Sequence, residues 1–169
     1  MRWVVVDTGY LLELFRVPLL HTAEGHQRVV EKFEELIAAG GRIYVPVPVI
    51  FEFANHVAQV ADGNARQALA NNLRASVTTS IEKQSPWIII PSMGERILLD
   101  LADTLALCNA FAVEFAVQAI SLTDTSVISV ARHITAAANQ RVPPAPVHIW
   151  TRDAQLKAHE PSAEANAFV

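Results

Sequence analysis

The 169-residue sequence has almost none of the features that would cross-link it or place it in a membrane. Its one cysteine, Cys108, excludes an internal disulfide and a cysteine-based zinc site, and we expect it to be a small core residue. No apolar run approaches the ~20 residues that a transmembrane helix needs. The apolar segment 1–6 is too short for the core of a signal peptide. We therefore expect a cytoplasmic protein with no membrane contact.

Basic residues are also scarce. The chain has 13 Lys and Arg against 17 Asp and Glu, which gives a net charge of −4, whereas a nucleic-acid-binding domain is usually basic. Setting aside the four acids discussed below leaves 13 acidic against 13 basic residues. The whole excess of negative charge could therefore lie in one pocket, where a divalent metal would neutralise it.

Motifs of several other enzyme classes are missing. There is no Gly-rich phosphate loop, and Glu52-x-x-x-His56 is not the His-Glu-x-x-His zinc motif. The six histidines show no ligand spacing. A phosphoaspartate phosphatase would need a second aspartate where Gly9 stands. A response-regulator receiver would need an acidic pair at the first strand and a lysine after the last, and neither is present.

Apolar residues make up 51% of the chain and charged residues 18%, so the chain can bury a core. Strand-like apolar runs alternate with longer segments of helical periodicity, which predicts an α/β fold with a parallel sheet and helices on both faces. We expect strands at 2–7, 43–47, 87–90 and 147–150, and helices at 23–39, from 49–54 onward, after a capping-box spacing at 92–95, and at 122–139.

These elements are expected to form one domain over residues 1–159, followed by a flexible tail over 160–169. The most polar long segment, 57–85, is expected to be a helical arm within that domain. Its apolar residues are spaced by four, as on one helix stripe: Ala65, Leu69, Leu73 and Val77.

Periodicity also predicts which side of two other helices is buried. In the first long helix the expected core residues are Val30, Phe33 and Ile37. In the helix that follows the third strand, Leu105 and Cys108 are among the residues expected on the buried side.

Four acidic residues stand where a metal site is expected. Asp7 ends the first strand, Asp153 follows the last strand, and Asp124 opens a helix. Glu52 lies in an apolar run, where a carboxylate is costly to bury without a cation or hydrogen-bond donors. Ligands of open α/β sheets bind at the carboxyl ends of the strands. A hard divalent ion bound through oxygens would relieve the repulsion among converging carboxylates.

Each of these acids also has a purely structural interpretation. Asp7 and Asp124 could cap helices, and Asp153 could be an exposed loop residue. Glu52 could pair with an arginine. The four together, in an order that one sheet would bring to one edge, favour the functional interpretation.

Four segments resemble, in order, the acidic motifs of the PIN-domain nucleases. Residues 4–12 resemble the opening strand, Asp and small hydroxyl residue, and residues 49–53 resemble the second motif, whose glutamate lies just inside a helix. Residues 122–131 resemble the third, an Asp at the start of an amphipathic helix, and residues 149–153 resemble the last, a strand followed by Thr-x-Asp. The resemblance runs the length of the chain, and its specificity lies in the ordered set.

The resemblance implies a PIN-like three-layer α/β/α domain that is a metal-dependent ribonuclease. It implies that the four acids are catalytic and hold Mg²⁺ or Mn²⁺, and that Thr8 and Thr151 support them by orienting a carboxylate or a metal-bound water. Many compact bacterial members, the VapC-like proteins, are toxins held by an antitoxin, and a homodimer is expected. The length of segment 57–85, and Thr125 where the family usually has alanine, depart from that pattern.

The expected reaction is hydrolysis of an RNA phosphodiester bond by a metal-activated water. Arg132 and Arg152 could contact a backbone phosphate, although solvated surface arginines are the more common finding. A catalytically inactive PIN-like scaffold that binds RNA or a protein is the alternative, and only metal-dependent cleavage separates the two.

Overall fold

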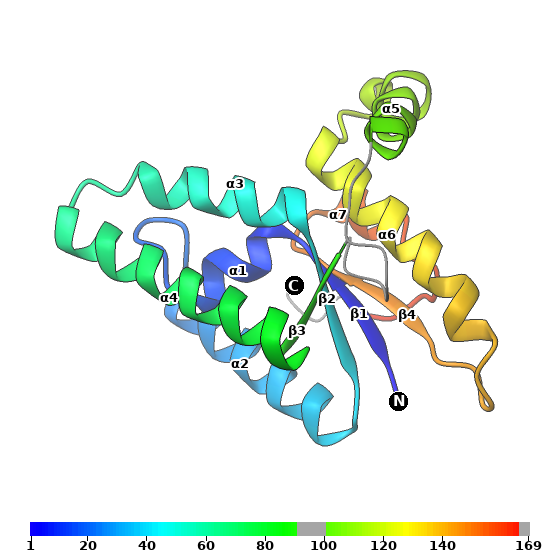
Figure 1. Cartoon of the computed structure of the whole chain (residues 1–169), viewed down its shortest axis with the longest axis horizontal. Helices are drawn as coiled ribbons and strands as arrows, with labels where there is room; N and C mark the ends of the chain where they lie inside the picture. Colours follow the sequence, from blue (N-terminus) through cyan, green and yellow to red (C-terminus); the bar gives the residue numbers. More distant parts are fainter. Residues whose placement is uncertain (91–100, 166–169) are drawn as a thin grey trace.

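The computed structural model describes residues 1–90 and 101–165 (Figure 1). The capping-box spacing predicted at 92–95 lies outside the described residues. The strands form one parallel sheet in the order β3-β2-β1-β4. They are β1 (Trp3–Val6), β2 (Arg42–Pro46), β3 (Trp87–Ile90) and β4 (Val147–Trp150). β3 and β4 have the predicted bounds, and β1 and β2 differ from them by one residue at each end.

Helices cover both faces of this sheet, so the predicted α/β class is confirmed and the structure is compatible with three layers. In Figure 1, α1 to α4 lie to the left of the sheet and α6 lies to its right, where it contacts β1, β2 and β4. The helices are α1 (Thr8–Leu14), α2 (Ala23–Ala38), α3 (Val47–Ala58), α4 (Gly63–Lys83), α5 (Leu101–Ala110), α6 (Leu122–Asn139) and α7 (Ala154–Lys157).

The sheet is buried from both sides, as its sequence requires. Every residue of β1 and β4 is buried, which is typical of parallel strands that lack polar alternation. β2 ends at Pro46, because the next proline, Pro48, fits the first turn of α3 but cannot donate to a sheet ladder. The prolines therefore place the start of α3, and with it Glu52, directly after β2.

The predicted core face of α2 is displaced by one residue at both ends, because Val29 and Leu36 are buried in place of Val30 and Ile37. Ile37 is 44% exposed, and the buried residues are Val29 and Leu36, with Phe33 partly buried between them. The helix stops where predicted, because Gly40 adopts a φ of +67° and its N–H donates to the Ile37 carbonyl.

The polar segment 57–85 is the second half of a helical hairpin made by α3 and α4. Asp62 caps α4 by accepting a hydrogen bond from the Ala65 N–H at 2.6 Å. The stripe predicted for this helix faces inward: Leu69 is buried, and Ala65 and Leu73 pack against the core. α4 contacts β3 and α3.

The predicted burial in α5 is wrong. Leu105 is 61% exposed and Cys108 is exposed, because α5 stands away from the sheet and packs against the start of α6 (Figure 1). A π-helical turn, Phe111–Phe115, and a 3₁₀ turn, Ala116–Gln118, connect it to α6.

No single helix in the described ranges is long and apolar enough to cross a membrane. One bent pair, Asp103–Gln118 with Leu122–Asn139, reaches that length and composition only when taken together across a 112° bend.

Candidate functional site

Asp7 lies at the carboxyl end of β1, where the backbone turns directly into α1. Its Oδ1 caps α1 by accepting a hydrogen bond from the Thr8 N–H, and its Oδ2 accepts one from Thr151 Oγ1 at 2.9 Å. Thr151 directly follows β4, the neighbour of β1 in the sheet. Two adjacent strand ends are thus joined through this carboxylate.

Glu52 reaches the same place from α3. Its Oε2 accepts a hydrogen bond from Thr8 Oγ1 at 2.6 Å. Thr8 therefore contacts two of the four acids, with its N–H on Asp7 and its hydroxyl on Glu52. The arginine pairing considered for Glu52 is not found among the described residues.

Asp153 follows β4 and caps α7, its Oδ1 accepting from the Gln155 N–H at 2.7 Å. Its own N–H donates to Thr151 Oγ1 at 2.9 Å. Hydrogen bonds thus run without a break from Glu52 through Thr8, Asp7 and Thr151 to Asp153. Both threonines predicted to support the acids lie within this chain of contacts.

Asp124 approaches from the opposite face of the sheet, in the first turn of α6. Ser121 caps that helix, and Asp124 Oδ2 accepts from the Ser121 N–H at 3.2 Å and the Ser121 hydroxyl at 2.7 Å. The two residues form a capping box, in which each side chain bonds the backbone of the other.

The four carboxylates repel one another electrostatically. Burial, together with the negative charges of Asp124 and Glu52, raises the pKa of Asp7 to about 6, although the hydrogen bonds from Thr151 and Thr8 lower it. Burial is also the main cause that raises the pKa of Asp124, and Glu52 and Asp153 add to it, while the bonds from Ser121 lower it. In the described part of the chain, no basic side chain forms an ion pair with any of the four.

Helix capping explains part of this arrangement but not all of it. Asp7, Asp124 and Asp153 each cap a helix start, yet a cap needs no second acid beside it. Glu52 Oε1, Asp124 Oδ1 and Asp153 Oδ2 accept no hydrogen bond from the described residues. These oxygens are suitable ligands for Mg²⁺, which prefers oxygen and keeps several waters.

The acids are not packed tightly enough for direct contact with one ion. Within the described residues, no three of them offer ligand atoms that all lie within 4.8 Å of one another. An ion among them would be held partly through water, as Mg²⁺ commonly is.

The two arginines proposed to contact substrate differ in their surroundings. Arg132 bonds Glu114 at 3.1 Å and lies over the ring of Phe115, two turns along α6 from Asp124. Arg152 lies between Thr151 and Asp153 in the chain, and its guanidinium pairs with the buried carboxylate of Glu13.

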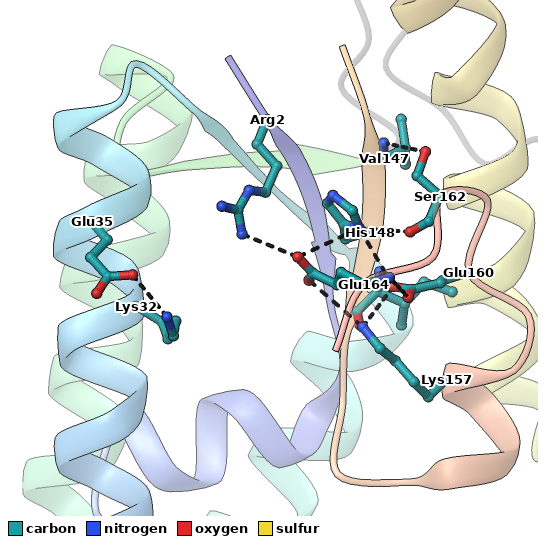
Figure 2. Close-up of polar contacts among 10 residues, drawn as sticks. Arg2, Lys32, Glu35, Val147, His148, Lys157, Glu160, Ser162 and Glu164 are labelled. Carbon is teal, nitrogen blue, oxygen red and sulfur yellow. Dashed lines mark hydrogen bonds and ion pairs between the residues drawn. The ribbon is translucent and has the colours of Figure 1, made fainter. Parts of the chain in front are cut away.

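A second group of ionisable residues, which the sequence interpretation missed, lies behind β4 (Figure 2). His148, Glu160 and Glu164 offer three ligand atoms that all lie within 4.8 Å of one another, so this group could hold a metal ion. Two signals could have indicated it: a histidine inside a buried strand, and two glutamates spaced by four.

Two basic side chains of the protein already pair with the carboxylates of this second group. Lys157 Nζ donates to Glu160 Oε2 at 2.6 Å, and Arg2 Nη1 donates to Glu164 Oε2 at 3.1 Å. The positive charges of Lys157 and Arg2 balance those of the two carboxylates. Lys157 would compete with a metal ion for Glu160, and we assign the group a structural role.

The chain was also compared with known proteins. No family model, no curated protein and no solved structure matches it.

Proposed function

We propose that this chain is a metal-dependent ribonuclease of the PIN type, with Asp7, Glu52, Asp124 and Asp153 at its centre. The observation that carries the proposal is the group of four neighbouring carboxylates with no described basic partner. Such a group destabilises a fold unless a cation binds to it. Helix capping and solvation explain a single acidic residue, but they do not explain four neighbouring ones.

Mg²⁺ or Mn²⁺, when bound, would lower the pKa of a coordinated water and offset the charge that develops on a phosphate during hydrolysis. The residues of the chain hold and orient the carboxylates. Thr8 fixes the rotamers of Asp7 and Glu52 at once, and Thr151 fixes Asp7 relative to Asp153. A site held in this way keeps its ligands in place through the reaction.

RNA is proposed as the substrate on the resemblance to PIN domains. The toxin role, an antitoxin partner and a homodimer stay predictions. A scaffold that binds RNA without cutting it is the alternative, and the cleavage experiment separates the two.

The experiment is cleavage of a mixed panel of single-stranded RNAs in Mg²⁺, in Mn²⁺ and in EDTA. Asp7→Asn is the test variant, and Asp62→Asn is its matched control. Both residues cap a helix and asparagine caps about as well as aspartate, but Asp62 belongs to α4 rather than to the acidic group. We expect cleavage only with metal, lost in Asp7→Asn and retained in Asp62→Asn.

Cleavage that persists in EDTA, or in Asp7→Asn, would overturn the proposal. Tight binding of RNA with no cleavage under any condition would favour the scaffold.

A further inference from the structure

A surface hollow is lined by two arginines, one of which, Arg152, directly precedes Asp153 in the chain. It has a volume of about 240 Å³ and lies between the end of α1, the start of α2 and the turn after β4. Its lining residues are Glu13, Thr22, Glu24, Gly25, Arg28 and Arg152.

Glu13 organises this hollow from beneath. Its side chain is 2% exposed, pairs with Arg152, and accepts a hydrogen bond from the Thr22 N–H at 3.0 Å. The first turn of α2 lies directly against it, since a Cβ at Gly25 would come within 2.5 Å of Glu13 Oε1. Only glycine leaves room there for the carboxylate, so the Glu13 side chain packs directly against the backbone of the first turn of α2.

Glu13 therefore holds Arg152 in place and leaves other N–H donors of its guanidinium available to a ligand. A guanidinium has five N–H donors in a fixed fork, and Glu13 occupies one side of it. The side chain remains 53% exposed. Among the described residues, Arg28, on the next turn of α2, forms an ion pair only with the exposed Glu24, at 2.6 Å, and such a surface contact is easily exchanged for another anion.

We propose that this hollow is a phosphate subsite, in which Arg152 and Arg28 bind a backbone phosphate of the RNA strand next to the one at the acidic group. The assignment rests on the proposed ribonuclease function. Glu13 is a positioning residue that acts through Arg152.

The position of the hollow suits this role. Arg152 adjoins both Thr151 and Asp153, and α1 leads from Asp7 to Glu13 over roughly 9 Å, at ~1.5 Å of rise per residue. A strand with one phosphate at the acids can therefore present a neighbouring phosphate to the two arginines. Such a subsite would also offset electrostatic repulsion, because an acidic centre alone would repel the phosphate backbone of the RNA.

Salt dependence of binding tests the subsite directly. The probe is a short fluorescein-labelled oligouridylate, followed by anisotropy in Ca²⁺ and recovered intact after each titration. Each lost phosphate contact lowers the slope of log K against log salt by about 0.7 for single strands. We expect that decrease in Arg28→Gln and again in Arg152→Gln. The exposed Arg74 of α4 is the matched control, and Arg74→Gln should keep the wild-type slope.

Arg152→Gln leaves Glu13 buried without a counter-charge and could fold poorly. The double variant Glu13→Gln/Arg152→Gln removes both charges together and should show the same decrease in slope as the single change. Arg28 is 44% exposed, so Arg28→Gln tests the subsite with the fold intact.

Kinetics with Mg²⁺ test the role of Glu13. Glu13→Gln frees the Arg152 guanidinium, so KM for RNA should rise several-fold while kcat falls much less. Arg152→Lys keeps the charge but not the fork, and should recover only part of the affinity. The positioning role would be wrong if Glu13→Gln lowered kcat as much as it raised KM, or if it changed the two constants no more than Arg74→Gln does.

The outcomes separate the subsite from the proposed function. Unchanged slopes in the hollow variants, or no binding of the probe by the wild type, would overturn the subsite while metal-dependent cleavage could still stand. Reduced slopes without any cleavage would support the subsite and overturn the ribonuclease.

Discussion

Two effects act in opposite directions on the protonation of the Asp7 carboxyl group. As the cap of α1 it is best ionised, since it accepts the Thr8 N–H, but its burial and the charges of Asp124 and Glu52 favour the protonated form. The net result is the raised pKa of about 6. A carboxyl group with that pKa can change charge near neutral pH, and the stability of the fold must follow.

The pH dependence of stability should show this conflict. The raised pKa means that the stability contributed by protonated Asp7 is fully present below pH 3.8 and is lost as the pH rises through about 6. Relative to Asp7→Asn, the wild type in EDTA should lose on the order of 2 kcal/mol of unfolding free energy over that window, after discounting for partial exposure. Urea unfolding of both proteins at acidic and at alkaline pH measures the difference. A difference that does not vary with pH would show that neither burial nor the neighbouring charges raise the pKa of Asp7.

Thr8 should matter more for activity than for stability. Thr8→Val removes the hydroxyl that holds Glu52, which should cost about 1 kcal/mol of unfolding free energy. Cleavage should fall by roughly 10- to 100-fold, as for other residues that orient metal ligands. Thr8→Ser keeps the hydroxyl and should retain most of both. The proposed role of Thr8 would be wrong if the valine and serine variants cleave RNA equally well.

Asp7, Asp124 and Asp153 could be singled out from the sequence because each stands at a strand end or a helix start, and Glu52 because a carboxylate in an apolar run is unusual. Glu13 and His148 were missed for a different reason. They lie inside apolar runs, and their partners belong to other segments: Arg152 is 139 residues from Glu13, and Ser162 is 14 residues from His148. Local patterns do not indicate which charge will be buried against which.

β4 is an edge strand whose outer side is closed by the chain that follows it. Val147 exchanges hydrogen bonds with Ser162, its N–H donating to Ser162 Oγ at 3.1 Å and its carbonyl accepting from the Ser162 N–H at 3.0 Å. The Ile149 N–H donates to Glu160 Oε2, and the Ile149 carbonyl accepts from Lys157 Nζ, both at 3.1 Å. The segment from Glu160 to Glu164, predicted to be part of a flexible tail, is thus held against the sheet and protects its edge.

Glu160 should be the residue on which this closure depends most. Glu160→Gln leaves Lys157 with a weaker partner in a largely buried setting, and losing one member of such a pair costs on the order of 3 kcal/mol. The matched control is Glu35→Gln, which removes an i,i+3 lysine partner on the exposed face of α2 (Figure 2). Thermal melts should show a large decrease for Glu160→Gln and little change for Glu35→Gln. Equal melting temperatures would mean that the tail adds nothing to stability.

Strands and helices were predicted better than the faces they bury. The parallel strands were predicted correctly because continuous β-branched runs admit few other interpretations, and α6 because Asp124 marks its start. α5 was assigned a buried side from its apolar residues alone. Its exposure depends on how far it stands from the sheet, which no local periodicity records.

Across the whole molecule, the two groups of carboxylates differ in what balances them. The group at the strand ends has no described basic partner, whereas Glu160 and Glu164 are matched by Lys157 and Arg2. The net charge of −4 therefore does not spread evenly over the surface. A metal ion would gain most where the protein has left the charge uncompensated.

The response of the melting temperature to metal should identify which group binds it. An ion that binds only the folded state adds about 2.7 kcal/mol at a hundred times its dissociation constant. The wild type should therefore melt higher in Mg²⁺ than in EDTA. Asp124→Asn removes a proposed ligand and keeps an acceptor for Ser121, so it should lose most of that shift. His148→Gln alters the group behind β4 and should keep the full shift, because Mg²⁺ prefers oxygen ligands and Lys157 already occupies that place. Each variant is compared with itself in EDTA, so a lower starting stability does not affect the result. If His148→Gln loses the shift and Asp124→Asn keeps it, the metal belongs behind β4 and the proposed centre at the strand ends is wrong.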